Sequence, residues 1–592
     1  MKKQNIMKTL GSITLILLLS LCLFSVSCTK EWLKPQPLSF FSPDNVYIDK
    51  AGFESLIVTM KKDLKMECYD AMNDLVMDFC TTDLGSPWSQ LDFKKLTPNS
   101  DQYYRFLAMF TAVYTAIKNT NVLISRIDNI TWENQADRNK LLAEAYWFRS
   151  YWYYRLVNSY GDIPFIGKEI TEAKLDFQSH SRWAILNKIQ SDMEFAVQWL
   201  PETAQPGDVT KGAANHLLAK IYLANLEFDK AIEAASAVIN GPYALMTDRF
   251  GSWKDDPRRN VIWDLHRPEN FSLPENTEAI MNTIDRFEAP SDAKSPGLFT
   301  MRMYGPAWHQ SKVLDSEGKP GMAQSGPEYD TLGRGNANVR LDYFYTYNLW
   351  NYQAETWKNT PDLRRSDINW IETYEYLYNN TTSVDYGKPF NPAYLATPLD
   401  TFYNMYAVPQ YILFVPQGDP NERPMGGNGD WYIFRLADTY LLRAEAYFWK
   451  NQLGDAANDI NVVRARSHAT AIAAGEVNID FIFDERAREL MAEEPRHSEL
   501  VRVSYIMAKS NLNGYTLDGF STKNYYYDRV MARNETYTKK PTLLGNTADL
   551  LPYHVLWPIP QDVITANTKG VINQNIGYVG ADNNIPPIEV IE

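Results

Sequence analysis

Apolar residues recur every three or four positions from about residue 101 to residue 240, and this period predicts consecutive helices. Three stretches have the length of long helices: residues 101–127, 139–165 and 182–200. Gly161 and Pro164 stop the second stretch, and Pro201 stops the third. The second stretch carries Trp147, Tyr151 and Tyr154 at helical spacing, so we expect these rings in the core.

Two helical stretches 225 residues apart share a pattern of small and large side chains. The first has Ala219, Tyr222, Phe228, Ala231 and Ala235, and the second has Ala444, Tyr447, Leu453, Ala456 and Ile460. Small residues where two helices cross closely, with a large residue beside them, are typical of a tetratricopeptide hairpin. The alternative is coincidence between two alanine-rich amphipathic helices. If the repeat is real, the two hairpins pack together.

Helical periodicity is largely lost between about residues 246 and 429. Gly, Pro, Asn, Asp and aromatic residues crowd together there. A loop region of this length is either disordered or functional, and its many Trp and Tyr residues favour an ordered one.

The amino terminus has the layout of a secretory signal peptide, with Lys2, Lys3 and Lys8 before an apolar run at 10–24. About 15 apolar residues are few for a membrane-spanning helix. Small residues precede Cys28, as in a bacterial lipobox, although Ser25 stands where Leu is usual. Lipidation at Cys28, simple secretion and an uncleaved anchor are the three alternatives, and the bulky Leu21 argues against cleavage at Cys22.

Charge and cysteine content exclude several classes of protein. The formal net charge of -14 and the pI near 5.2 leave no basic footprint, so we expect no nucleic-acid partner. After removal of the leader and lipidation of Cys28 only Cys68 and Cys80 remain, which excludes a disulfide scaffold and a multi-cysteine metal site. These two cysteines either form one disulfide or stay as buried thiols.

No specific catalytic signature is present. The chain lacks H-E-x-x-H, G-x-S-x-G, P-loop and EF-hand motifs. Its seven His residues have no ligand spacing. A glycosidase needs only two carboxylates, so a hydrolase stays open, but nothing in the sequence favours one.

Ordered motifs along the chain resemble the SusD/RagB family of outer-membrane nutrient-binding lipoproteins. The motifs are "YGDIPF", "AEAYWFRSYWYYRL", "AKIYL", "YIFRLADTYLLRAEAYFWK", "FIFDERARELMAEEPRHSELVR" and "LWPIPQDVITANTKGVINQNIGY". The departures are His497 and Ser498, where an aromatic pair is common, and Glu499, where Asp is usual. Taken alone, the charges of "DERARELMAEEPR" are typical of structural pairs along a helix face, and "WPIPQ" is typical of a closing strap.

The resemblance implies a mainly α fold, a tetratricopeptide-like helical scaffold with a large loop-rich variable lobe. It also favours lipidation at Cys28, with residues 29–37 as a tether. We expect a signal peptide at 1–27, a helical part at 28–245, the lobe at 246–430, and a carboxyl-terminal helical part at 431–592 that belongs to the same globular unit as 28–245. The resemblance implies a partner too, a TonB-dependent SusC-like transporter that the lipoprotein covers as a lid.

Candidate ligand-binding residues lie in two regions, because a glycan site needs exposed aromatic planes with polar groups at their edges. In the first loop these are Asp83, Trp88, Gln90 and Asp92. In the lobe they are Tyr304, Trp308, His309, Gln310, Trp350, Tyr352 and Trp357. Each Trp has the alternative of packing in the core.

The sequence therefore predicts a cell-surface lipoprotein that binds a glycan, or a peptide as the second choice, and passes it to the transporter. We expect no catalytic residue and no cofactor, with structural calcium left open. The rival hypotheses are a secreted glycoside hydrolase and a helical-repeat adaptor at the membrane.

Overall fold

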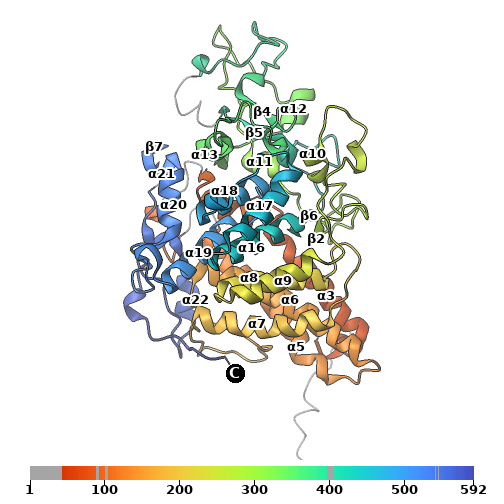
Figure 1. Ribbon diagram of the computed structural model, residues 1–592, viewed down its shortest axis with the longest axis vertical. Coiled ribbons are helices and arrows are strands. Elements are labelled where there is room, and N and C mark those ends of the chain that lie inside the picture. The colour runs from red at the N-terminus through yellow and green to blue at the C-terminus, as the bar shows by residue number, and fades with distance from the viewer. Residues whose placement is uncertain are drawn as a thin grey trace, which may run out of the picture. The chain divides into compact units, whose positions relative to one another are not determined.

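The computed structural model describes residues 43–591 except 72, 88–92, 101–104, 396–403, 541, 544–545 and 548 (Figure 1). Residues up to Gly52 and residues from Phe53 onward form two separate compact units. The first unit contributes the short helix α2 (Pro43–Val46). The predicted signal peptide, Cys28 and the tether lie outside the described residues. Among the helices of the described ranges, none has both the length and the apolar character that crossing a membrane requires.

The three long helices predicted before residue 201 are confirmed. They are α5 (Phe106–Arg126), α6 (Gln135–Tyr160) and α7 (Arg182–Trp199). The side chain of Asn134 caps α6, and α6 ends at Gly161, whose φ of 68° suits a residue without a Cβ. Trp147, Tyr151 and Tyr154 are at most 4% exposed, so the predicted aromatic stripe lies in the core.

The two hairpins 225 residues apart have the same local structure, which confirms the repeat. The first consists of α8 (Lys211–Ala224) and α9 (Phe228–Ile239), and the second of α16 (Leu436–Trp449) and α17 (Leu453–Arg466). Leu226 and Asn451 turn the chain with φ of 61° and 59°. In each turn the next backbone N–H donates to a tyrosine carbonyl, that of Tyr222 at 2.8 Å and that of Tyr447 at 2.9 Å.

The hairpins pack together although they are distant in sequence, because α16 lies against both α8 and α9 (Figure 1). Three further helices continue the helical scaffold: α18 (Ile479–Glu489), α19 (Arg496–Lys509) and α20 (Tyr525–Arg533). The helix α19 packs against α6 and α8, so amino- and carboxyl-terminal helices share one core. The fold is mainly α and tetratricopeptide-like.

The "WPIPQ" segment lies against the helices, as a strap does. Trp557 is buried, its backbone N–H donates to the Ser159 carbonyl at 2.8 Å, and its ring stacks on His497 at 4.6 Å. A short helix, α22 (Gln561–Ala566), follows it. His497, one of the departures from the family pattern, is therefore a core residue, and burial lowers its pKa to about 4.

In its described residues the lobe has only short helices and strands (Figure 1). Its helices include α10 (Val261–Leu265), α11 (Thr300–Tyr304), α12 (Pro327–Leu332), α13 (Tyr343–Thr346) and α15 (Gln410–Leu413). Two strands of the lobe pair with strands outside it: β3 (Val339–Leu341) with β1 (Gly85–Pro87), and β2 (Ala279–Thr283) with β6 (Trp431–Arg435). Inside the lobe β4 (Trp370–Ile371) pairs with β5 (Val408–Pro409), and near the carboxyl terminus β7 (Thr542–Leu543) pairs with β8 (Asn546–Thr547). All four pairs are antiparallel. The lobe has its own core cluster of Trp308, Val313, Met322, Tyr329, Tyr376, Tyr378 and Phe390.

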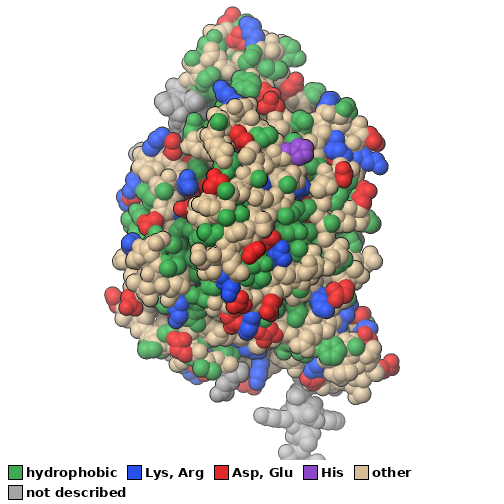
Figure 2. All heavy atoms as spheres, viewed as in Figure 1, with side chains coloured by type: hydrophobic (Ala, Val, Ile, Leu, Met, Phe, Trp, Pro, Cys, Tyr) green, Lys and Arg blue, Asp and Glu red, His purple; other side chains and the backbone are tan. Residues whose placement is uncertain are grey.

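Cys68 and Cys80 are free, buried thiols, and burial raises the pKa of both. The disulfide alternative is thereby removed. On the face drawn in Figure 2, acidic and basic side chains are interspersed, and no patch of one sign dominates it.

Candidate functional site

Three aromatic side chains of the lobe meet at its surface and form an aromatic row of Tyr343, Tyr347 and Trp357. The ring centroids of Tyr343 and Tyr347 are 4.9 Å apart, as are those of Tyr347 and Trp357, with tilted planes in both pairs. Tyr343 is 46% exposed, whereas Tyr347 and Trp357 are half-buried. The row therefore offers ring surface to solvent while its members support one another.

Local sequence places this row. Asp342 caps α13 by accepting from the backbone N–H of Phe344 at 3.0 Å, and so fixes the point where β3 turns into α13. Tyr343 is the first residue of α13 and Tyr347 follows its last, so the two stand four residues apart, one helical turn, and neighbour each other on one face. The backbone N–H of Trp357 donates to Asn351 Oδ1 at 3.1 Å, which holds the third ring beside them.

Charged groups border the row. The Arg365 guanidinium lies 5.0 Å from the Trp357 ring centroid, and its Nη2 is 2.5 Å from Glu372 Oε1. Lys358 Nζ lies 5.1 Å from the same centroid. Burial, followed by the charge of Glu372, raises the pKa of Tyr347 to about 12, so its phenol stays neutral and able to donate a hydrogen bond. Rings with polar edges suit a ligand that has both apolar faces and hydroxyls.

The pairing of β1 with β3 joins the first predicted ligand loop to the lobe. Gly85 pairs with Leu341 and Pro87 with Val339. Because the pair is antiparallel, Pro87 lies beside the start of β3, whereas Tyr343 follows the end of β3, on the side of Gly85. Trp88, Gln90 and Asp92 themselves lie outside the described residues, so their predicted role stays a prediction.

Four of the predicted lobe residues are buried, which corrects the expectation that they are exposed. Trp308 is fully buried in the lobe core, and its Nε1 donates to the Gly333 carbonyl at 2.9 Å. His309 Nε2 lies 2.9 Å from the Gly335 carbonyl, and Trp350 Nε1 donates to the Tyr345 carbonyl at 2.8 Å. Tyr304 is 3% exposed. Backbone carbonyls satisfy the indoles inside the protein, so neither Trp308 nor Trp350 presents a free ring face.

The other predicted residues divide between surface and interior. Gln310 and Trp357 are half-buried. Tyr352 is half-buried, and its hydroxyl donates to Glu476 Oε1 at 2.8 Å. Asp83 corrects the expectation of a loop carboxylate, because it is fully buried between two guanidiniums.

Asp83 links the first loop to the scaffold. Its carboxylate lies 2.8 Å from Arg496 Nη2 and 2.8 Å from Arg529 Nε. Burial alone would raise the pKa of Asp83, but the two guanidiniums outweigh it and hold the pKa well below its usual range. The residue therefore anchors the chain just before β1.

Sequence reasoning missed Tyr343, Tyr347, Tyr374, Arg365 and Glu372. Tyr374 is 60% exposed and lies two residues from Glu372. The available signal was the density of rings in "YFYTYNLW", where alternate rings face opposite ways: Tyr345 is buried and Tyr343 is exposed. Ring density alone does not show which of them reach the surface.

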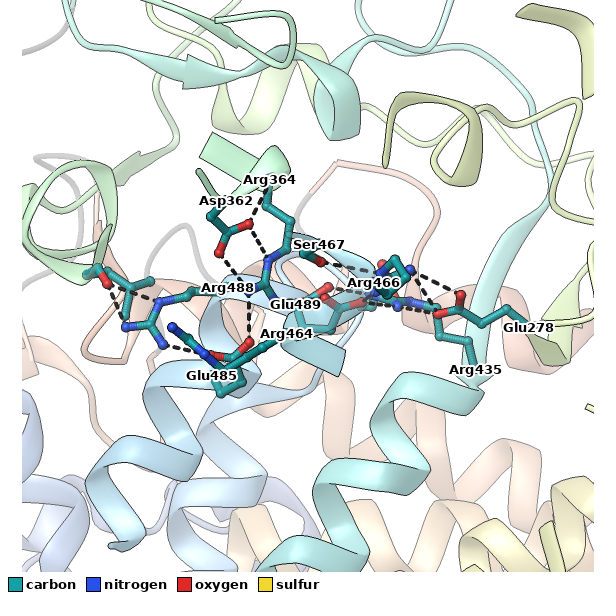
Figure 3. A network of polar contacts seen from close by, with 12 residues as sticks. Glu278, Asp362, Arg364, Arg435, Arg464, Arg466, Ser467, Glu485, Arg488 and Glu489 are labelled. Carbon is teal, nitrogen blue, oxygen red and sulfur yellow. Dashed lines mark hydrogen bonds and ion pairs between the residues drawn. The ribbon is translucent and has the colours of Figure 1, made fainter. Parts of the chain in front are cut away.

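A second polar assembly, the ion-pair network, is buried where the lobe meets the scaffold (Figure 3). It consists of Glu278, Asp362, Arg364, Arg435, Arg464, Arg466, Glu485, Arg488 and Glu489, each at most 5% exposed. Arg364 of the lobe lies 2.8 Å from both Glu485 and Glu489 of α18, and Arg464 of α17 lies 2.7 Å from Glu485. Guanidiniums saturate these carboxylates, so they are not poised as acid and base.

The network confirms a structural role for the "DERARELMAEEPR" charges but corrects their pairing. We expected Glu485, Arg486 and Glu489 to pair along one helix face. Instead Glu489 pairs with Arg364, Arg435 and Arg466 from other elements. Arg486 pairs with Asp438 at 2.8 Å and with Glu494 at 3.0 Å. Across the described part of the chain, no group of three or more His, Cys, Asp and Glu side chains could hold a metal ion.

Comparison with protein families gives two matches along the chain. The SusD family model matches residues 314–578, and a model described as "Starch-binding associating with outer membrane" matches residues 46–223. The starch-binding protein SusD of Bacteroides thetaiotaomicron is 35% identical over 449 residues, which cover 69% of this chain and 75% of that protein. SusD-like protein P25 of Formosa agariphila is 22% identical over 581 residues, 92% of this chain and 95% of that protein.

Solved structures show the same fold. A laminarin-binding SusD-like protein superposes with a TM-score of 0.60 at 17% identity, covering 90% of this chain and 100% of that one. NanU of Bacteroides fragilis gives a TM-score of 0.60 at 18% identity, covering 91% and 99%.

Proposed function

Since this chain belongs to the SusD family, we propose that it is a carbohydrate-binding protein of the outer-membrane surface, and that the aromatic row is its main contact with glycan. The rings of the aromatic row carry this proposal, with Tyr343 exposed and Tyr347 and Trp357 half-buried at the surface of the lobe. Names of the relatives support it, because they include proteins described as binding starch and laminarin.

Binding at the row needs no chemistry beyond stacking and hydrogen bonding. The C–H faces of a sugar stack on the rings, and each such contact contributes about 0.5–1.5 kcal/mol. The phenols of Tyr343 and Tyr347 and the exposed Lys358 supply hydrogen-bonding groups for the hydroxyls at the ring edges. The site binds glycan without cleaving it.

A panel of starch, laminarin and other polysaccharides in native affinity gels tests the site. We expect at least one polysaccharide to retard the protein, with Tyr343→Ala and Trp357→Ala each weakening binding about two- to tenfold. Tyr386→Ala is the matched control, because Tyr386 is a lobe tyrosine that is 57% exposed and outside the row. Unchanged retention in both row variants would refute the assignment, and released reducing ends would favour the hydrolase.

The membrane attachment and the partner belong to the same proposal. A lipid on Cys28 holds the protein at the membrane, since each buried methylene contributes about 0.8 kcal/mol. The bound glycan then passes to a TonB-dependent transporter of the SusC type, which the protein covers as a lid. Cys28→Ser should release the protein from membranes, and affinity purification of the wild-type protein from detergent extracts should recover the transporter. A Cys28→Ser protein that stays membrane-bound would contradict the anchor.

A further inference from the structure

A groove of about 380 Å³ opens on the scaffold and shares no residue with the aromatic row. Three segments line it: residues 202–210 between α7 and α8, Pro242 and Tyr243 after α9, and residues 271–282 of the lobe, which include most of β2. Its volume falls within the range of roughly 300–1,000 Å³ that small-molecule sites occupy.

Tyr243 forms a fixed aromatic wall of this groove. Its hydroxyl lies 3.0 Å from Thr210 Oγ1. Its ring packs closely over Gly212 of α8, where a Cβ would come within 2.4 Å of the ring atoms. The ring therefore loses little freedom when a flat apolar face stacks on it, and three prolines stiffen the remaining walls.

The carboxylates of the groove already have partners. Glu202 Oε1 lies 2.8 Å from Lys211 Nζ, and Asp208 pairs with Lys61. The other polar lining groups are amides and hydroxyls, among them Gln205 and Asn282. A charged ligand would find no unpaired opposite charge among these residues, whereas a neutral ligand rich in hydroxyls would find donors and acceptors.

Asn282 supplies an acceptor that lacks a partner. The residue is 4% exposed and lines the groove. Its Nδ2 donates to the Phe271 carbonyl at 2.9 Å, but no hydrogen bond from the described residues reaches its Oδ1. Buried polar atoms in native proteins are nearly always satisfied, so this oxygen requires a donor beyond the described residues, either a water or a ligand hydroxyl.

We propose that this groove is a second carbohydrate site, which takes one or two neutral sugar units against Tyr243 with a hydroxyl donated to Asn282. The site is separate from the aromatic row and does not depend on it. Two sites on one chain would hold a long glycan at two points and raise its overall affinity above that of either site alone.

Hydrogen exchange in the full chain carrying Trp357→Ala tests the groove apart from the row. The probes are maltohexaose, laminarihexaose and cellohexaose at millimolar concentration, with a proline-rich peptide tested beside them. We expect one of them to slow exchange in residues 202–210 and 271–282. Ala204→Trp should fill the groove from an exposed position and weaken this binding roughly tenfold or more. Ala237→Trp, on the exposed face of α9, is the matched control and should leave it unchanged.

Three results would overturn the proposal. The first is no protection of either segment by any of the three oligosaccharides. The second is protection that persists in Ala204→Trp. The third is protection by proline-rich peptides alone, which would make the groove a peptide site. The two proposals are tested by different measurements, because the hydrogen-exchange experiment uses a protein in which Trp357 is already replaced. Glycan binding at the aromatic row is tested in the affinity gels, and glycan binding in the groove is tested by hydrogen exchange.

Discussion

Replacing Glu489 by glutamine removes one negative charge from the centre of the ion-pair network. Glu489 is 3% exposed and pairs with three guanidiniums, those of Arg364, Arg435 and Arg466. Glutamine has nearly the same volume, but its NH₂ group directs hydrogens toward cations that need an acceptor. Packing is preserved, so the variant isolates the charge.

The expected loss of stability follows from this geometry. At least one hydrogen bond to a charged group disappears, which costs about 1.5–3 kcal/mol. The variant also leaves one buried positive charge without a compensating carboxylate. Removal of one partner of a buried ion pair lowers the free energy of unfolding by about 3–5 kcal/mol in total. At about 2.1 cal/mol/K per residue for the entropy of unfolding, a loss of about 4 kcal/mol lowers Tm by roughly 3 °C in a chain of this size.

Calorimetry and urea denaturation of Glu489→Gln against wild type measure this loss. Glu317→Gln is the matched control, because Glu317 pairs with Lys319 at 2.9 Å on the surface, where both side chains are more than half exposed. Its expected effect is below about 1 kcal/mol. If the two variants lose the same stability, the buried network does not hold the lobe to the scaffold and our reasoning fails.

The remaining predictions concern the core of the lobe, stability at low pH and the reactivity of the two thiols. Trp308→Ala should destabilise the protein by about 3–5 kcal/mol through a core cavity, whereas the half-buried Trp357→Ala should cost far less; equal thermal shifts would contradict the burial of Trp308. Burial would raise the pKa of Glu485, but Arg364 and neighbouring guanidiniums lower it to about 2. Stability from this lowered pKa is present above pH 4.5 and should fall as pH drops from about 4.5 toward 2, so urea midpoints that stay constant across this window would refute it. Cys68 and Cys80 should react with a thiol reagent only after unfolding, and rapid labelling of the native protein would disprove their burial.

The sequence alone determined most of the scaffold. Helical periodicity located α5 and α7, because apolar residues that repeat every three to four positions form one buried face of a helix. The helix α6 is buried at nearly every position from Leu141 to Tyr160, so the length of its stretch and the stop at Gly161 located it. The repeat at a spacing of 225 residues identified the packed hairpins, because close helix crossings constrain side-chain size at fixed positions. The loss of period after residue 246 marked the lobe.

Tertiary structure alone decided which aromatic and charged side chains face solvent. Trp308 and Trp357 have similar polar neighbours in the sequence, yet Trp308 fills the lobe core and Trp357 joins the row, because in a region of short elements no period relates position to exposure. Asp83 lies in a loop sequence typical of the surface, but Arg496 and Arg529, more than 400 residues away, enclose it. Long-range pairing of this kind depends on how α19, α20 and β1 pack against one another, and the local sequence around Asp83 does not determine that packing.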